Sequence, residues 1–124
     1  MKLALVIAGG GLGSAGRYLV SLWMSQHAGT SFPWGTLSVN IVGSFLIGLL
    51  ATLADESGKF GIDTRLFLIG GVLGGFTTFS AFSLESWRLL DHGEPVRAMV
   101  YVVSSVVLAL AAAIAGVALA RAIA

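Results

Sequence analysis

Four long apolar segments constrain the fold of this chain more than any other feature. They cover about residues 3–24, 35–54, 64–90 and 96–120, with short polar connections between them. About 20 apolar residues suffice to cross a bilayer as a helix. The sequence therefore predicts an all-α integral membrane protein with four transmembrane helices in one domain, residues 1–124. We expect the first segment to be a retained helix and not a cleaved signal peptide.

The composition excludes most soluble functions. Hydrophobic residues make up 56% of the chain and charged residues only 10%, whereas about a quarter of a soluble globular domain is charged. A net charge of +1 without a basic patch argues against binding to nucleic acid. The chain has no cysteine, its two histidines lie in predicted loops, and no group of residues supports catalysis. We therefore predict that it is not an enzyme.

The loop charges give only a weak preference for one orientation. An even number of spans places the N-terminus, the second loop and the C-terminus on the same side. Positive residues in short loops set the orientation of a membrane protein. The positive residues on that side are Lys2, Lys59, Arg65 and Arg121, and those on the other are Arg88 and Arg97. The chain either prefers one orientation or inserts both ways and pairs as an antiparallel homodimer.

A glycine motif in the first segment has two interpretations. Residues 11–16, GLGSAG, match the G-x-G-x-x-G pattern of dinucleotide-binding proteins. That motif requires a soluble βαβ unit and a later acidic residue, and the chain offers neither. Small residues on one helix face also let two membrane helices approach closely. Packing is the better interpretation, and the residues concerned are Gly9, Gly13 and Gly16.

Polar residues inside the spans have both a packing and a functional interpretation. Arg17 is either paired or facing a cavity, or it snorkels to the membrane interface. Asn40 either hydrogen-bonds across a helix interface or faces a pore, where its amide donates to an anion. Ser104 and Ser105 share a face of the fourth helix with Tyr101. They either bond back to a carbonyl one turn earlier or line a path.

The third segment carries the stretch GGVLGGFTTFSAFS at residues 70–83. Gly74 and Gly75 disfavour a continuous helix, and the threonines after them are β-branched. Irregular backbone at membrane depth is tolerated only where it is buried in protein or lines a cavity, and it exposes carbonyl and N–H groups that bind ions. Packing alone would not require the aromatic and hydroxyl pairs that follow, Phe79 with Phe82 and Ser80 with Ser83.

Four motifs resemble the Fluc (CrcB) family of fluoride channels, in the same order over essentially the whole chain. They are GGGLGSAGRY, GTLSVNIVGSFLIG, GGVLGGFTTFSAFSLE, and Tyr101 with Ser105. The third motif is the most specific. The resemblance implies a passive, fluoride-selective channel that exports fluoride and lowers its cytoplasmic concentration. It also implies a multi-pass protein of the bacterial inner membrane, a break in the third helix, and a dual-topology antiparallel homodimer with two pores.

The resemblance further implies a structural sodium ion at the centre of the dimer. The backbone carbonyls that hold this ion in the family match Gly74 and Thr77. Carbonyl oxygens suit a hard cation, and two copies of the chain would supply four of them. The ion is structural and is not transported.

The fluoride path of the family also maps onto this sequence by motif. Aromatic rings carry a positive edge, so ring edges can face fluoride without a charged side chain. The matching path residues are Asn40, Thr78, Phe79, Ser80, Phe82, Ser83, Tyr101 and Ser105. Arg17 matches the arginine of the first helix and Glu85 the acid after the phenylalanine pair, both as structural polar residues.

One departure from the family pattern lies one turn after Ser105. Several relatives carry another hydroxyl there, and this chain has Ala109. The hydroxyl track is then shorter, or it relies more on Ser80 and Ser104.

Two other functions remain open from the sequence. A small dual-topology multidrug transporter has about this length, but it needs a membrane-embedded carboxylate, normally in the first helix. Here the first helix carries Arg17 and no acid, and the nearest acid is Glu85. A purely structural membrane subunit would carry no flux.

Overall fold

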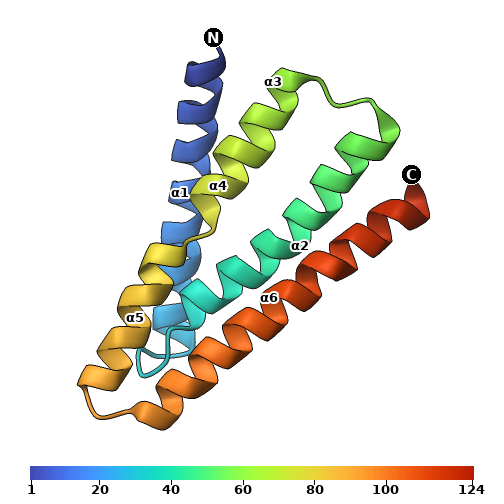
Figure 1. Cartoon of the computed structure of the whole chain (residues 1–124). Helices are drawn as coiled ribbons and strands as arrows, with labels where there is room; N and C mark the ends of the chain where they lie inside the picture. The colour runs from blue at the N-terminus through green and yellow to red at the C-terminus, as the bar shows by residue number, and fades with distance from the viewer.

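The computed structural model describes residues 1–124 and is entirely helical (Figure 1). Four helical segments are long and apolar enough to cross a membrane, which confirms the predicted all-α architecture. The third segment is a succession of shorter helices. The elements are α1 (Lys2–His27), α2 (Trp34–Ser57), α3 (Ile62–Arg65), η1 (Leu66–Leu73), α4 (Gly74–Phe76), α5 (Phe79–Asp91) and α6 (Pro95–Ile123). Each predicted range lies inside one of the four segments.

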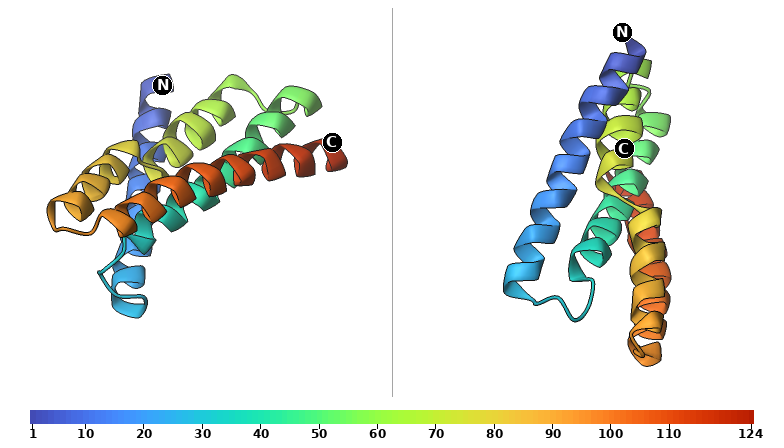
Figure 2. Two further views of the ribbon diagram at one scale, coloured as in Figure 1. Left: turned by 60° about the horizontal axis from the view of Figure 1, so that its bottom comes forward. Right: turned by 90° about the vertical axis from the view of Figure 1, so that its left-hand side faces the viewer.

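The two ends of the molecule carry different termini, loops and turns. Both termini lie at the end that carries α3, while the α1–α2 loop and the α5–α6 turn lie at the other (Figure 1). The helices α2 and α6 pack side by side along much of their length. The first half of the third segment, η1 and α4, packs against α1, whereas its second half, α5, packs against α6. As a result, α1 and α5 diverge toward the loop end (Figure 2).

Local sequence sets several helix ends. Pro95 begins α6 at a position where the N–H that proline lacks would have had no helical partner. Gly58 ends α2 with a φ of 66°, in the left-handed conformation that glycine adopts at little cost.

Glycines bring the helices into backbone contact. A Cβ atom on Gly13 of α1 would fall on the carbonyl oxygen of Val72 in η1. A Cβ atom on Gly48 of α2 would likewise fall on the carbonyl oxygen of Ala113 in α6. Close approach of this kind is typical of membrane helices, where association depends on van der Waals packing. Gly9 and Gly13 of α1 therefore serve the packing role, as expected, and Gly16 makes an ordinary contact with the ring of Phe76.

The third segment leaves the helical conformation at two residues. Thr77 has a ψ of 160° and Thr78 a φ of −154°, so both are extended between α4 and α5. Gly74 and Gly75, expected to disfavour a continuous helix, are instead helical. The absence of a side chain at Gly75 instead allows close packing on α1, because a Cβ there would meet the carbonyl oxygen of Gly10. The η1 segment before them is a π-helix, which the sequence pattern did not predict.

Candidate functional site

A cavity of about 410 Å³ lies between α2, the third segment and α6. It is lined by 14 residues, none of which is charged. Its polar lining comes from Asn40 and Ser44 of α2, Thr77 and Thr78 of the extended link, and Ser105 of α6. The phenylalanines of α5, Phe79 and Phe82, line it as well. The cavity is therefore a mainly apolar, uncharged space inside the membrane-spanning region, with a few polar groups in its wall.

Asn40 connects α2 to the extended link by two hydrogen bonds. Its side-chain Nδ2–H donates to the carbonyl oxygen of Thr78 at 3.0 Å, and the N–H of Thr78 donates to Asn40 Oδ1 at 2.8 Å. The amide thus pairs with one backbone residue as a neighbouring strand would. Asn40 therefore meets both expectations: it bonds across a helix interface, and it lines the cavity.

Two backbone carbonyls at this link are left without their helical donors. A regular helix would pair the carbonyl of Gly74 with the N–H of Thr78, but that N–H donates to Asn40. The carbonyl of Thr77 accepts no hydrogen bond, and the N–H of Ala81, four residues on, donates to Thr78 Oγ1 at 3.1 Å. No cluster of three or more His, Cys, Asp or Glu side chains exists in the chain that could hold a metal ion. Any cation site here would consist of carbonyl oxygens.

Aromatic rings form a row that starts at the cavity. The ring centroids of Phe79 and Phe82 lie 5.4 Å apart, and those of Phe82 and Tyr101 lie 5.3 Å apart. Phe32 of the α1–α2 loop meets Tyr101 edge to face at 5.5 Å. Phe79 is 78% exposed, whereas Tyr101 is fully buried. The row runs from the open surface of the chain into its interior.

Ser105 differs from Ser83 and Ser104, whose hydroxyls bond back to their own helices. Its Oγ is the one buried side-chain N or O atom without a hydrogen-bond partner. By contrast, Ser104 Oγ donates back to the carbonyl of Tyr101 at 3.3 Å, and Ser83 Oγ to that of Phe79 at 2.9 Å. An unpaired buried polar group costs about 1–3 kcal/mol. The Ser105 hydroxyl is thus a donor available to a guest in the cavity.

Arg17 lies at the C-terminal end of α4. Its Nε–H donates to the carbonyl of Gly75 at 3.1 Å, and Ser14 Oγ contacts the same oxygen at 3.5 Å. A cation is favourable near the carbonyls that end a helix. Arg17 is therefore paired inside the protein and does not extend to the membrane interface alone.

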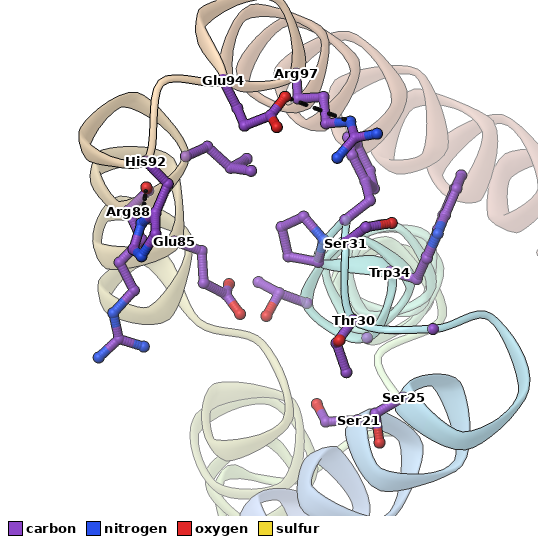
Figure 3. A pocket seen from close by; sticks show the side chains of 16 residues that line it. Ser21, Ser25, Thr30, Ser31, Trp34, Glu85, Arg88, His92, Glu94 and Arg97 are labelled. Carbon is purple, nitrogen blue, oxygen red and sulfur yellow. Dashed lines mark hydrogen bonds and ion pairs between the residues drawn. The ribbon is translucent and has the colours of Figure 1, made fainter.

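Glu85 belongs to a second, more polar pocket near the α1–α2 loop. This pocket has a volume of about 490 Å³, and Glu85 extends into it from α5 (Figure 3). Tyr101 Oη donates to Glu85 Oε1 at 3.1 Å. Glu94 and Arg97 face each other at its edge, with Oε2 and Nε 3.8 Å apart (Figure 3). Glu85 thus lies outside the uncharged cavity, beyond the aromatic row.

Comparison with known proteins identifies the family. A family model described as "CrcB-like protein, Camphor Resistance (CrcB)" matches residues 4–117. The chain belongs to the CrcB-like family. The predicted resemblance to CrcB proteins is thereby confirmed.

Curated relatives of this CrcB-like chain match it over nearly its full length. A protein of Rhizobium meliloti is 56% identical over 120 residues, which cover 97% of this chain and 96% of the relative. One from Agrobacterium fabrum is 52% identical over 121 residues, which cover 98% and 97%. One from Sphingopyxis alaskensis is 53% identical over 116 residues, which cover 94% and 92%. All three are named fluoride-specific ion channel FluC. These names agree with the prediction that the chain is not an enzyme.

Most of the predicted path residues of this CrcB-like chain come together, and three do not. Those that line the cavity are Asn40, Thr78, Phe79, Phe82 and Ser105, together with the predicted cation ligands Gly74 and Thr77. Ser80, Ser83 and Tyr101 lie outside it. Ser80 Oγ pairs with Thr78 Oγ1 at 3.2 Å, and Ser83 bonds back within α5. Helical spacing groups serines on one face, but it does not show which of them already have a partner.

Sequence reasoning missed several contributors to the site. Gly43 of α2 makes room for the methyl group of Thr77, because a Cβ on Gly43 would collide with Thr77 Cγ2. Phe32 supports Tyr101 from a loop. In the sequence, only the position of Phe32 just before Pro33 and α2 pointed to such a supporting role. Ala109, the departure from the family pattern, does line the cavity and leaves it one hydroxyl fewer.

Proposed function

We propose that this CrcB-like chain forms a passive fluoride-selective channel through which accumulated fluoride leaves the cell. The relatives that carry the name of such a channel support the proposal. The observation that carries it is the buried Ser105 hydroxyl, which has no partner and lies in a cavity without charged side chains. A strongly hydrated anion needs donors of this kind in place of water.

The cavity lining supplies hydrogen-bond donors but no charged side chain that would bind an anion too tightly for release. Ser105 offers its hydroxyl, and Asn40 has a second Nδ2–H besides the one bonded to Thr78. The edges of Phe79 and Phe82 add partial positive charge. A conducting site must bind strongly enough for entry and weakly enough for release. Hydroxyl, amide and ring-edge donors satisfy both conditions, and in the proposed channel a path too narrow for chloride would exclude that larger ion.

A second copy of the chain in the opposite orientation would complete the channel. Phe79 lines the cavity but is 78% exposed, so the cavity opens at the surface of a single chain. The weak charge bias of the loops supports insertion in both orientations. We propose an antiparallel homodimer in the bacterial inner membrane, each copy closing the open side of the other.

A structural sodium ion is proposed at the centre of this dimer. The carbonyls of Gly74 and Thr77 fit it, because their helical donors are engaged elsewhere and carbonyl oxygen suits a hard cation. When bound, the ion would supply a fixed positive charge between the two copies. The residues of this chain keep the carbonyls free and hold the surrounding backbone in place.

A growth assay in bacteria that lack their own fluoride exporter tests the proposed function. We expect expression of the chain to restore growth in medium that contains fluoride. A multidrug transporter would instead restore growth in the presence of toxic organic cations, and a structural subunit would restore neither. The cavity contains no carboxylate to exchange protons, so we expect no protection against organic cations. Failure to protect against fluoride, with the protein present in the membrane, would contradict the proposal.

A further inference from the structure

We infer that Asn40 and Thr78 act as positioning residues for the cation site, because their side chains take the two N–H groups that would otherwise close the helix over its carbonyls. This inference rests on the proposed function, since it concerns the proposed sodium ion. It assigns Asn40 a role besides that of a donor to fluoride.

The first step concerns the carbonyl of Gly74. In an uninterrupted helix this oxygen would accept the N–H of Thr78 four residues on. That N–H donates to Asn40 Oδ1 at 2.8 Å, and Asn40 Nδ2 donates to the carbonyl of Thr78 at 3.0 Å. Two opposed bonds to one residue fix both its position and its orientation. Asn40 thus holds Thr78 extended and away from Gly74.

The second step concerns the carbonyl of Thr77. Its helical donor would be the N–H of Ala81, which donates instead to Thr78 Oγ1 at 3.1 Å. Thr78 is the N-cap of α5, so its hydroxyl satisfies the first turn of that helix. The carbonyl of Thr77 is left without any hydrogen bond. Two neighbouring side-chain contacts therefore leave the two predicted cation ligands free.

Two of the neighbouring carbonyls are occupied by side chains from other helices. The carbonyl of Gly75 accepts from Arg17 and Ser14, and that of Thr78 accepts from Asn40. The side chain and the N–H of Thr77 both donate to the carbonyl of Leu73, at 3.0 and 3.1 Å, which anchors Thr77 to the preceding turn. Polar side chains from α1 and α2 thus occupy the carbonyls of Gly75 and Thr78, each directly after one of the two proposed ligands.

Sodium-dependent thermal stability of the purified protein tests this inference independently of transport. A ligand that binds only the folded protein raises its midpoint of unfolding, and the stabilisation grows with the ratio of ligand concentration to dissociation constant. We expect sodium to stabilise the wild type relative to N-methyl-D-glucamine. In Asn40→Ala the apparent sodium dissociation constant should rise about 10- to 100-fold, as for other groups that orient metal ligands. Val42→Ala, on an exposed position of α2, is the matched control and should keep the wild-type sodium response.

A second pair of variants keeps the test decisive if Asn40→Ala does not fold. Thr78→Val preserves the shape of the side chain but removes the acceptor for the Ala81 N–H, whereas Thr78→Ser retains it. We expect Thr78→Val to weaken the sodium response and Thr78→Ser to restore it. A purely structural role would lower the unfolding midpoint equally in both salts.

The outcomes separate this inference from the proposed function. If sodium stabilises the wild type and both Asn40→Ala and Thr78→Val keep the full response, the positioning role is wrong while the cation site stands. If the wild type itself shows no sodium response after long exchange into N-methyl-D-glucamine, the proposed cation site is wrong. The positioning role, which depends on that site, is then wrong as well.

Discussion

At the scale of single residues, what separates the serines of the membrane region is whether the hydroxyl already has a partner. Serine in a membrane helix commonly bonds back to a carbonyl of the preceding turn, as Ser83 and Ser86 do. Ser105 is buried, lines the cavity and has no such bond. Its hydroxyl therefore does not contribute to holding the helix and is free for direct contact with the proposed permeating ion.

We predict that Ser105→Ala lowers fluoride flux without loss of stability. Removal of one donor to an anion should reduce the rate by about tenfold, equivalent to 1.4 kcal/mol. The unfolding midpoint should stay the same or rise, because the substitution removes a buried hydroxyl that has no partner. Flux of purified protein in liposomes and thermal unfolding in detergent measure the two quantities.

The matched control is Ser86→Ala on α5. Its hydroxyl donates to the carbonyl of Phe82 at 2.7 Å and lies outside the cavity, so its loss should leave flux unchanged. Equal flux in Ser105→Ala and the wild type would remove Ser105 from the path.

At the scale of helices, the seam between α1 and the third segment depends on the absence of side chains. Gly13 touches the backbone of η1, whereas Gly11, two residues away, has open space around the position of a Cβ atom. Membrane helices gain no hydrophobic driving force from lipid, so close backbone contact is a main source of their association. The two glycines should respond very differently to the same substitution.

We predict that Gly13→Ala destabilises the protein and that Gly11→Ala does not. The new Cβ of Gly13→Ala would fall on the carbonyl of Val72, and overpacking of this kind costs about 1–3 kcal/mol. Thermal unfolding monitored by circular dichroism measures the difference. If the two variants unfold at the same temperature, the seam between α1 and η1 is looser than described.

At the same scale, the sequence predicted which segments are helical but not how the third one is interrupted. Hydropathy over 20 residues suffices to predict four spans. The glycine pattern pointed to Gly74 and Gly75, but both are helical, and Gly75 packs against the backbone of α1. The extended residues are instead held by Asn40, 38 residues distant in sequence from Thr78. A contact between distant segments leaves no periodic pattern in a single sequence.

The candidate site, like the third segment, was only partly predictable from the sequence. Motif resemblance named half of the cavity residues, and it also placed Ser80 and Ser83 among the path donors. Both already have hydrogen-bond partners along α5 and its cap. Which hydroxyl stays free depends on side-chain rotamers and on packing between helices, and spacing along one helix does not specify either.

At the scale of the whole molecule, a single chain presents a cavity with one open side. Phe79 stands at that opening, and many other large apolar side chains face outward, as expected for a surface in contact with lipid or a second copy. The loops carry few charges and little bias between the two sides. These features are consistent with the proposed insertion in both orientations and the proposed pairing across the open side.

We predict that the chain inserts in both orientations in about equal numbers. The chain has no cysteine, so a single introduced thiol can be labelled without background. Gly61→Cys in the exposed connection after α2 leaves every charge in place. A membrane-impermeant thiol reagent should label about half of the molecules in intact cells and all of them after permeabilisation. Labelling of all molecules or none in intact cells would establish a single orientation.

Anion efflux from liposomes that contain the purified protein tests the central claim most directly. The vesicles are loaded with equal concentrations of fluoride and chloride, and both ions are followed outside with selective electrodes. We expect fast fluoride efflux down its gradient, without added ATP or a proton gradient, and chloride efflux no faster than from protein-free vesicles. Equal efflux of the two anions, or no fluoride efflux at all, would contradict the account.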